Sequence, residues 1–409
     1  MGIVDETTAR RLDRDGLAAA LQDSRRRTLA LLSAAEQALG PGLPVPCTAE
    51  LNPPLWEVGH IGWFADWWIS RHPQRHLGTA ADPEVARLPA RQARRGLDAD
   101  ACYNSSTVPH DRRWHLPLPD LDTTRADLAD SLHDTLQRLA DAPETDAGLY
   151  FFRLALFHED MHAEAAVYMA QTLGYDPGPA ALVNGSPHLA GPAPAAPTIA
   201  VAATDTMLGW AGPGFAFDNE CAAHRVAVPA FEIATQPVTW GAYLPFVDSG
   251  ACDQRHHWSE AGWAWRQGTG TPAPRHLRRT QRGWERHSFG RWQPLDPEAP
   301  ACHLSAYEAQ AWCAWAGHRL PTEAEWTVAT QQAGFAWGQV WEWTASAFAP
   351  FPGFTPHPYR DYSQPWFDGR PVLKGASPAT SARLRHRQYR NYFPAARTDI
   401  FAGLRPVAL

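Results

Sequence analysis

The feature that most constrains this chain is an uninterrupted helical pattern at residues 145–173. The stretch has no proline, its one glycine lies near the start at Gly148, and apolar residues recur every three or four positions. Gly174 follows as a helix stop. Within it, in FHEDMHAEA, His158 and His162 stand four residues apart and therefore on one face of a helix. Two imidazoles so placed can bind one first-row metal ion, although two ordinary core or surface histidines would show the same spacing.

The same letters, H-E-x-x-H, occur in zinc proteases, where Glu159 would be the general base. The metzincin version needs a glycine and a third histidine at positions where this chain has Ala165 and Tyr168, so that version is excluded. A thermolysin-like protease, with a glutamate ligand further along the chain, stays open on spacing alone. The histidine pair therefore predicts a metal site without fixing its chemistry.

A third ligand is expected from another helix, and His60 is the best candidate. It lies in LWEVGHIGWFADWW, where four aromatic residues share its side of a predicted helix: Trp56, Trp63, Phe64 and Trp67. A histidine buried in such an apolar stripe needs a polar partner, which a metal ion or a backbone carbonyl can provide. The rival ligands in the same part of the chain are His110, His115 and His133.

The two halves of this 409-residue chain differ in texture. Residues 10–175 hold four helical patterns, at 14–38, 53–70, 123–141 and 145–173. A stretch rich in Pro and Ala at 191–203 is typical of a linker, and the only later helical patterns are at 305–317 and 322–331. We therefore predict an α plus α+β fold. A metal-binding four-helix bundle would occupy residues 1–190 and an α+β domain residues 204–409.

Composition argues against several other classes of protein. The formal net charge is −7 and no block of Lys or Arg stands out, so neither nucleic acid nor a membrane surface is an expected partner. The absence of an apolar run of 18 residues and the acidic first segment predict neither a membrane span nor a secretory signal. Six cysteines without a C-x-x-C motif favour a reduced, cytoplasmic protein.

The order of motifs resembles that of a known enzyme family. A histidine in an early helix, followed by H-x-x-x-H-x-E in a later one, is similar to the ergothioneine-type sulfoxide synthases, which are mononuclear non-haem iron enzymes. These join a damage-resistance-type helical bundle to a formylglycine-generating-enzyme-like (C-type-lectin-like) domain. The second half resembles that domain in five motifs: GFAFDNECAAHRVAVPAFEIA, PVTWGAYLPFV, HRLPTEAEW, VWEWT and FAGLR. The resemblance covers nearly the whole chain and disfavours the protease.

This resemblance implies a cofactor and a reaction. Fe(II) would be bound by His60, His158 and His162, with coordination positions left open for substrate and O2. The acceptor would be the imidazole ring of hercynine, a trimethylated histidine whose quaternary ammonium suits aromatic side chains. By the same resemblance, Asn391 and Tyr392 in the segment RNYFPAAR would lie beside hercynine.

Several positions depart from the family pattern in the expected substrate pocket. Phe393 stands where relatives that use γ-glutamylcysteine carry an aspartate, whereas the later Arg397 is present. Phe348 stands where some members have a catalytic tyrosine, and Met161 where a glutamine is usual. An acidic anchor for the amino group of a thiol peptide is therefore replaced by an apolar ring.

The stretch YNSST departs in the same direction, because Ser106 and Thr107 replace a tyrosine pair of other members. Together with HEDMH, this pattern resembles the selenoneine synthases, which join hercynine to the selenosugar 1-seleno-β-glucose with O2. A neutral sugar needs no aspartate anchor, so we expect oxidative carbon–selenium bond formation. The alternative is an ergothioneine-type sulfoxide synthase that uses γ-glutamylcysteine or cysteine, and a non-catalytic scaffold is a third interpretation.

Overall fold

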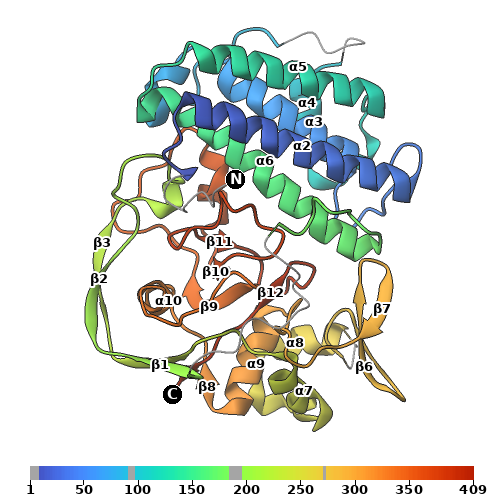
Figure 1. Cartoon of the computed structure of the whole chain (residues 1–409), viewed down its shortest axis with the longest axis vertical. Helices are drawn as coiled ribbons and strands as arrows, with labels where there is room; N and C mark the ends of the chain where they lie inside the picture. Colours follow the sequence, from blue (N-terminus) through green and yellow to red (C-terminus); the bar gives the residue numbers. More distant parts are fainter. Residues whose placement is uncertain (1–8, 91–96, 184–195, 270–272) are drawn as a thin grey trace.

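Long helices form one end of the molecule, and strands, short helices and loops form the other (Figure 1). The structure is a computed structural model that describes residues 9–90, 97–183, 196–269 and 273–409. Among these residues, no helix combines the length and apolar character needed to cross a membrane. The expected change from a helical first half to a mixed second half is confirmed.

Four long helices pack against one another in the first half. They are α2 (Arg14–Leu39), α3 (Pro54–Ala65), α5 (Leu121–Ala140) and α6 (Asp146–Leu173). The shorter elements are the π-helical turn η1 (Asp66–Ser70) that continues α3, the 3-10 helices η2 (Arg75–Ala80) and η3 (His110–His115), and α4 (Ala99–Tyr103). The long helices lie where the sequence pattern predicts them.

Local signals fix both ends of α6, which carries two of the histidines. The Thr145 hydroxyl accepts a hydrogen bond from the backbone N–H of Gly148 at 3.0 Å, and Asp13 and Asp120 cap α2 and α5 in the same way. α6 ends at Gly174, whose φ of 77° is the left-handed conformation that glycine adopts at low cost. The position of the ligand helix along the chain is therefore set by its own sequence.

The second half contains two four-stranded sheets, a hairpin and a three-stranded meander. The sheet β1–β4–β13–β8 consists of β1 (Thr198–Val201), β4 (Phe231–Ala234), β13 (Val407–Ala408) and β8 (His318–Arg319). The sheet β11–β10–β9–β12 consists of β11 (Asn391–Tyr392), β10 (Pro371–Gly375), β9 (Trp341–Ala347) and β12 (Ala402–Gly403). The hairpin is β2 (Thr204–Leu208) with β3 (His224–Val228), and the meander is β5 (Leu277–Thr280), β6 (Gly283–Ser288) and β7 (Arg291–Pro294).

Helices of the second half surround these strands. The α-helices are α7 (Trp240–Asp248), α8 (Glu260–Thr269), α9 (Ala306–Ala316) and α10 (Glu323–Ala329). Short 3-10 helices are η4 (Asp218–Glu220), η5 (Ala251–Asp253), η6 (Arg255–His257), η7 (Arg360–Tyr362) and η8 (Gln364–Trp366). The sequence pattern predicts α9 and α10 but misses α7 and α8. α7 contains Pro245, which interrupts a helical pattern, and α8 is only ten residues long.

The expected linker at 191–203 is partly wrong. Its residues 198–201 form β1, which pairs with β4 and therefore already belongs to the second half. Its first residues, 191–195, lie outside the described part of the chain.

Three sequence motifs meet around one buried carboxylate. Glu342 of VWEWT lies on β9 and is fully buried. It accepts hydrogen bonds at 2.7 Å from the guanidinium of Arg405 in FAGLR and from the indole of Trp326 in HRLPTEAEW. A carboxylate buried without such partners would be strongly destabilising, so these motifs depend on one another.

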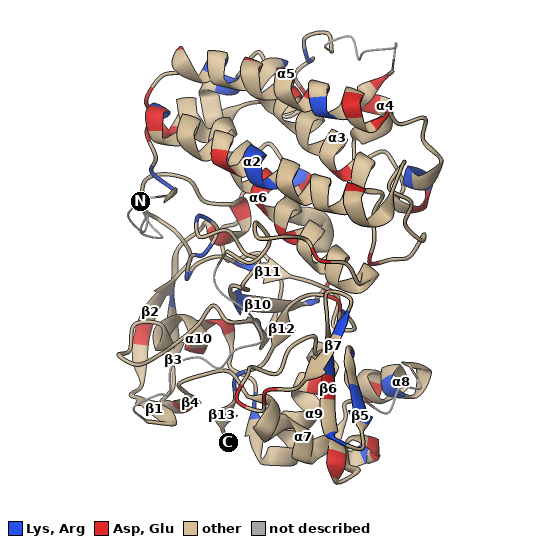
Figure 2. Cartoon of the chain, turned by 45° about the vertical axis from the view of Figure 1, so that its right-hand side comes forward, with Lys and Arg blue, Asp and Glu red and all other residues tan. Residues whose placement is uncertain are grey.

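α6 lies at the junction of the two halves, and basic and acidic residues are interspersed over both (Figures 1 and 2). The carboxylate of Glu164 on α6 is buried and accepts hydrogen bonds of 2.7–2.9 Å from three side chains of the second half: Trp341, Ser377 and Thr380. Asp160, one turn earlier, accepts two hydrogen bonds of 2.9 Å from the guanidinium of Arg383. The ligand helix is therefore fastened to the second half on both sides of His162.

Candidate metal centre

The three histidines predicted as ligands come together between α3 and α6. The Nε2 atom of His158 lies 3.1 Å from Nε2 of His60 and 3.2 Å from Nε2 of His162. All three nitrogens lie within 4.8 Å of one another. The four-residue spacing on α6 and the apolar stripe of α3 thus bring three donor atoms to one point.

Partners behind the rings fix the orientation of two of these imidazoles. Nδ1 of His60 donates a hydrogen bond of 2.7 Å to the backbone carbonyl of Tyr103. Nδ1 of His162 is hydrogen-bonded to the carboxylate of Glu57, which lies one turn before His60 on α3. Because a carbonyl can only accept, the proton of His60 is on Nδ1 and its Nε2 carries a lone pair. Such an acceptor behind a ring is typical of metal-binding histidines.

Burial favours the neutral form of His60 and of His158. It lowers the pKa of His60 to about 3, with the nearby His162 adding to the effect. Burial also lowers the pKa of His158 well below its usual value, again helped by the two neighbouring histidines. Neutral imidazoles with lone pairs directed at one point suit a first-row metal cation, so the residues present fit a metal ion.

Aromatic rings surround the histidines. Phe64 stacks on His158 with ring centroids 3.6 Å apart, and Trp56 stacks on His60 at 4.9 Å. Tyr359, from the second half, meets His158 edge-on at 6.5 Å. These rings exclude water from one side of the centre and hold the imidazoles in fixed planes.

Met161 connects the centre to tyrosines of the second half. It precedes His162 on α6, and its Sδ atom accepts hydrogen bonds from the hydroxyls of Tyr389 at 3.3 Å and Tyr362 at 3.7 Å. The two hydroxyls are themselves 3.2 Å apart. Tyrosines are thus absent from the two positions discussed in the sequence, but others reach the site from elsewhere.

Three more of the predicted pocket residues lie together next to this tyrosine pair. Phe348 is fully buried and stacks on Tyr392 with ring centroids 3.9 Å apart. The Tyr392 hydroxyl donates to the backbone carbonyl of Tyr362, and the Asn391 side chain accepts from the Tyr392 backbone N–H at 2.9 Å. This group is therefore joined to Met161 through Tyr362.

The structure places Phe393 and Arg397 against each other. The guanidinium of Arg397 lies 5.2 Å from the centroid of the Phe393 ring and forms an ion pair with Asp399. Asp399 is almost fully buried, so this pair is shielded from solvent. Arg397 is therefore already matched by a carboxylate before any substrate enters.

The rival interpretations do not match the geometry. Nε2 of His110 bonds to the backbone carbonyl of Leu51 at 2.9 Å, and His115 and His133 are exposed. Glu159, the general base of a zinc protease, makes a buried ion pair with Arg25 at 2.8 Å. A base held in that pair is not available to activate water at the three histidines.

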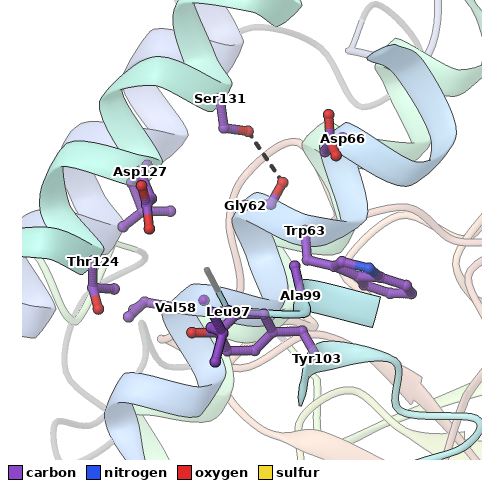
Figure 3. A pocket seen from close by; sticks show the side chains of 12 residues that line it. Val58, Gly62, Trp63, Asp66, Leu97, Ala99, Tyr103, Thr124, Asp127 and Ser131 are labelled. Atoms are coloured by element: carbon purple, nitrogen blue, oxygen red, sulfur yellow. Dashed lines mark hydrogen bonds between the residues drawn. The ribbon is translucent and has the colours of Figure 1, made fainter. Parts of the chain in front are cut away.

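Gly59 on α3 allows Tyr103 to approach the helix closely. A Cβ atom at this position would lie 2.6 Å from the Tyr103 hydroxyl oxygen and closer still to its ring. Figure 3 shows the Tyr103 side chain lining a cavity of about 80 Å³ between α3 and α5, where Ser131 donates a hydrogen bond of 3.1 Å to the carbonyl of Gly62. Tyr103, whose carbonyl orients His60, can therefore occupy this position only because Gly59 has no side chain.

Gly59→Ala should weaken metal binding although it changes no ligand. The new methyl group must displace Tyr103, which pulls its carbonyl away from Nδ1 of His60; overpacking of this kind costs about 1–3 kcal/mol. Gly62→Ala is the matched control, because its Cβ would meet Leu128 at an ordinary 3.4 Å. Titration of each protein with Fe(II) against a competing chelator measures the effect. Equal affinities for the two variants would contradict it.

A second cavity, of about 210 Å³, lies against the aromatic wall of the centre. Phe64 and Tyr359, which contact His158, form part of its lining. The remaining lining consists of indoles, polar side chains and prolines: Trp63, Trp67, Trp68, Asn104, Ser105, Ser106, Glu84, Arg360, Asp361, Pro83 and Pro358. It offers flat apolar faces and hydrogen-bonding groups, which suits a small polar molecule.

The residues predicted from the sequence include Tyr392 but not Glu57, Tyr359, Tyr362 or Tyr389. Glu57 precedes His60 by three residues and shares its helical face, so its spacing could have identified it. The other tyrosines could not be found in this way, because Tyr359 and Tyr362 come from an irregular segment around η7 without periodicity.

Comparison with known proteins settles the family. The domain family described as "Sulfatase-modifying factor enzyme 1-like domain" matches residues 190–337. A hercynine oxygenase of Mycolicibacterium thermoresistibile is 32% identical over 450 residues, which cover 95% of this chain and 94% of that protein. The chain belongs to the hercynine oxygenase family.

Further relatives agree with this membership. A hercynine oxygenase of Mycobacterium tuberculosis is 32% identical over 413 residues, covering 87% of this chain and 90% of that protein. The formylglycine-generating enzyme of Bos taurus is 30% identical over 164 residues, covering 36% of this chain and 44% of that protein. The resemblance inferred from the motifs is thus confirmed at the level of the hercynine oxygenase family, whereas the narrower assignment to selenoneine synthases gains no support from these relatives.

Proposed function

We propose that this chain is an iron(II)-dependent enzyme that uses O2 to join the imidazole ring of hercynine to a chalcogen atom of a second small molecule. The main support is that three histidine Nε2 atoms lie close together. The chain that carries them is matched over 95% of its length by a hercynine oxygenase. Bound by His60, His158 and His162, iron(II) would supply dioxygen binding and redox chemistry.

The chain's own residues hold the ligands and shape the pocket. Glu57 and the carbonyl of Tyr103 keep the Nε2 lone pairs of two histidines directed at one point. Phe64 excludes water on the His158 side. Among the described residues, three histidines meet at this point, so further coordination positions would stay open for O2 and substrate.

We place hercynine against the wall formed around Met161. Support comes from Met161 lying between the two ligand histidines of α6 and from the hydrogen bonds that tie its sulfur to the tyrosine pair. Aromatic faces of this kind attract a quaternary ammonium group. Asn391 and Tyr392 are proposed to contact hercynine, with Phe348 supporting the Tyr392 ring from behind.

Sulfur is the donor atom that the relatives favour. Besides the hercynine oxygenases, the Schizosaccharomyces pombe protein named "Ergothioneine biosynthesis protein 1" is 26% identical over 228 residues, covering 47% of this chain and 27% of that protein. Ergothioneine carries sulfur on its imidazole ring. We therefore propose carbon–sulfur bond formation, with γ-glutamylcysteine or cysteine as donor, as the first candidate reaction.

Charge in the pocket favours a second candidate, an uncharged selenosugar such as 1-seleno-β-glucose. In the 210 Å³ cavity, the two carboxylates of Glu84 and Asp361 stand against the single guanidinium of Arg360. Arg397 is already paired with Asp399, and Phe393 offers no acidic anchor for an amino group. A thiol peptide with two carboxylates would meet net negative charge here, whereas a neutral sugar would not.

A competition experiment separates the two candidates. Iron-loaded protein receives limiting hercynine, O2 and equal amounts of γ-glutamylcysteine, cysteine and 1-seleno-β-glucose, and products are separated by mass. A hercynine adduct that depends on O2 is expected; a dominant thiol adduct is the outcome for the first candidate, and a dominant sugar adduct is the outcome for the second. Dominance of a thiol adduct would reject the selenosugar and leave the sulfur reaction. Absence of every adduct would overturn the proposed function.

A further inference from the structure

A third cavity lies between α2, α3 and α6, and His162 forms part of its wall. Its volume is about 40 Å³. Most of its lining is aliphatic: Leu31, Leu32, Val58, Ile61, Ala166 and Met169. Glu57 and His162 also line it, so it reaches the imidazole of a metal ligand. Its lining includes half-buried residues, Asn52 and Tyr175, so it approaches the molecular surface as well.

The size and chemistry of this cavity select its occupant. A cavity of about 10–15 Å³ can hold one water molecule. A cavity of about 40 Å³ therefore admits a molecule of a few atoms but no organic substrate. Cavities with apolar walls stay dry and bind small apolar molecules such as xenon. An apolar diatomic gas fits both conditions.

We infer that this cavity binds dioxygen and supplies it to the metal centre. The inference rests on the proposed function, because it takes O2 as a substrate in addition to hercynine and the chalcogen donor. The proposed function places the organic substrates beside Met161 and Phe64, whereas His162 lines this cavity from α6. A separate store of gas lets O2 arrive without passing the organic substrates.

Thr28 differs from the other polar residues of the lining, because its buried hydroxyl could hold a water molecule. The Oγ1 atom of Thr28 lines the cavity region and has no hydrogen-bond partner among the described residues. A water molecule held by Thr28 is therefore the alternative occupant, and the experiments must distinguish it from a gas.

The first experiment needs neither iron nor activity. Crystals of the metal-free protein are pressurised with xenon, for the wild type, Ala166→Leu and Ala165→Leu. Ala166 lines the cavity, whereas its neighbour Ala165, also half-buried, is not part of the lining. We expect a xenon atom in the wild type and in Ala165→Leu and none in Ala166→Leu. A water molecule at Thr28 and no xenon in the wild type would overturn the inference.

The second experiment follows O2 during turnover. Ala166→Leu should raise KM for O2 several-fold, with kcat at saturating O2 and KM for hercynine unchanged, and Ala165→Leu should behave as wild type. Ala166→Val, a smaller change, keeps the test valid if leucine disturbs folding. An unchanged KM for O2 in a variant that has lost xenon would refute delivery from this cavity. If the wild type consumes no O2 with hercynine, the proposed function fails while the xenon result still decides whether the cavity binds gas.

Discussion

His158→Ala should lose iron and all O2-dependent activity. His158 Nε2 is the central atom of the cluster, 3.1 and 3.2 Å from the other two nitrogens, and an open site with three protein ligands cannot spare one. Iron content by elemental analysis should fall from about one ion per chain to nearly none. His60→Ala and His162→Ala should behave in the same way.

His133→Ala is the control, since it removes an exposed histidine of the same helical half. Fe(II) should raise the melting temperature of the wild type and of His133→Ala, because a ligand that binds only the folded state stabilises it. His158→Ala should show no such shift while remaining folded by circular dichroism. Full iron occupancy in His60→Ala would mean that the third ligand is another residue.

Glu57→Gln should weaken iron binding by about 10- to 100-fold, the effect typical of losing the partner behind a ligand histidine. Glu57 is buried, and its carboxylate bonds to Nδ1 of His162. An amide has the same shape but carries no charge, so it polarises the imidazole less and makes a poorer ligand of His162. Chelator competition with Fe(II) gives the affinity of each variant.

Glu159→Gln provides the matched comparison, because it neutralises a second buried carboxylate near the same cluster. Glu159 bonds to Arg25 rather than to a histidine, so its loss should lower stability, by about 3–5 kcal/mol for a broken buried pair, and leave iron affinity unchanged. Equal losses of affinity in the two variants would show that Glu57 acts only through general packing.

The helices and the metal ligands could be predicted because their signals are local. His158 and His162 need only the helical repeat of α6, and His60 follows from the aromatic stripe of α3. β1 escaped prediction because its residues lie in a Pro- and Ala-rich segment and become a strand only by pairing with β4.

The pocket walls could not be predicted for a different physical reason. Tyr362 and Tyr389 are 27 residues apart and meet Met161 of α6 only through the folding of the second half. The group of Tyr103 that contacts His60 is its backbone carbonyl, which every residue has. The identity of residue 103 therefore does not indicate this role. Contacts between the two halves depend on tertiary packing, and they produce no periodic pattern of residues in the sequence.

The fastening of α6 has a consequence for how such a chain can be recombined. Ligand histidines occupy one face of α6, while Asp160 and Glu164 bury their carboxylates against the second half. A helical half cut off at the linker would leave Glu164 without its hydrogen-bond partners from the second half, and would leave Asp160 with Ser24 of α2 but without Arg383. Grafting another domain onto it requires carrying over the residues that satisfy them, Trp341, Ser377, Thr380 and Arg383. The two halves are therefore separate along the chain, but the helix that carries two of the metal ligands depends on side chains of the second half.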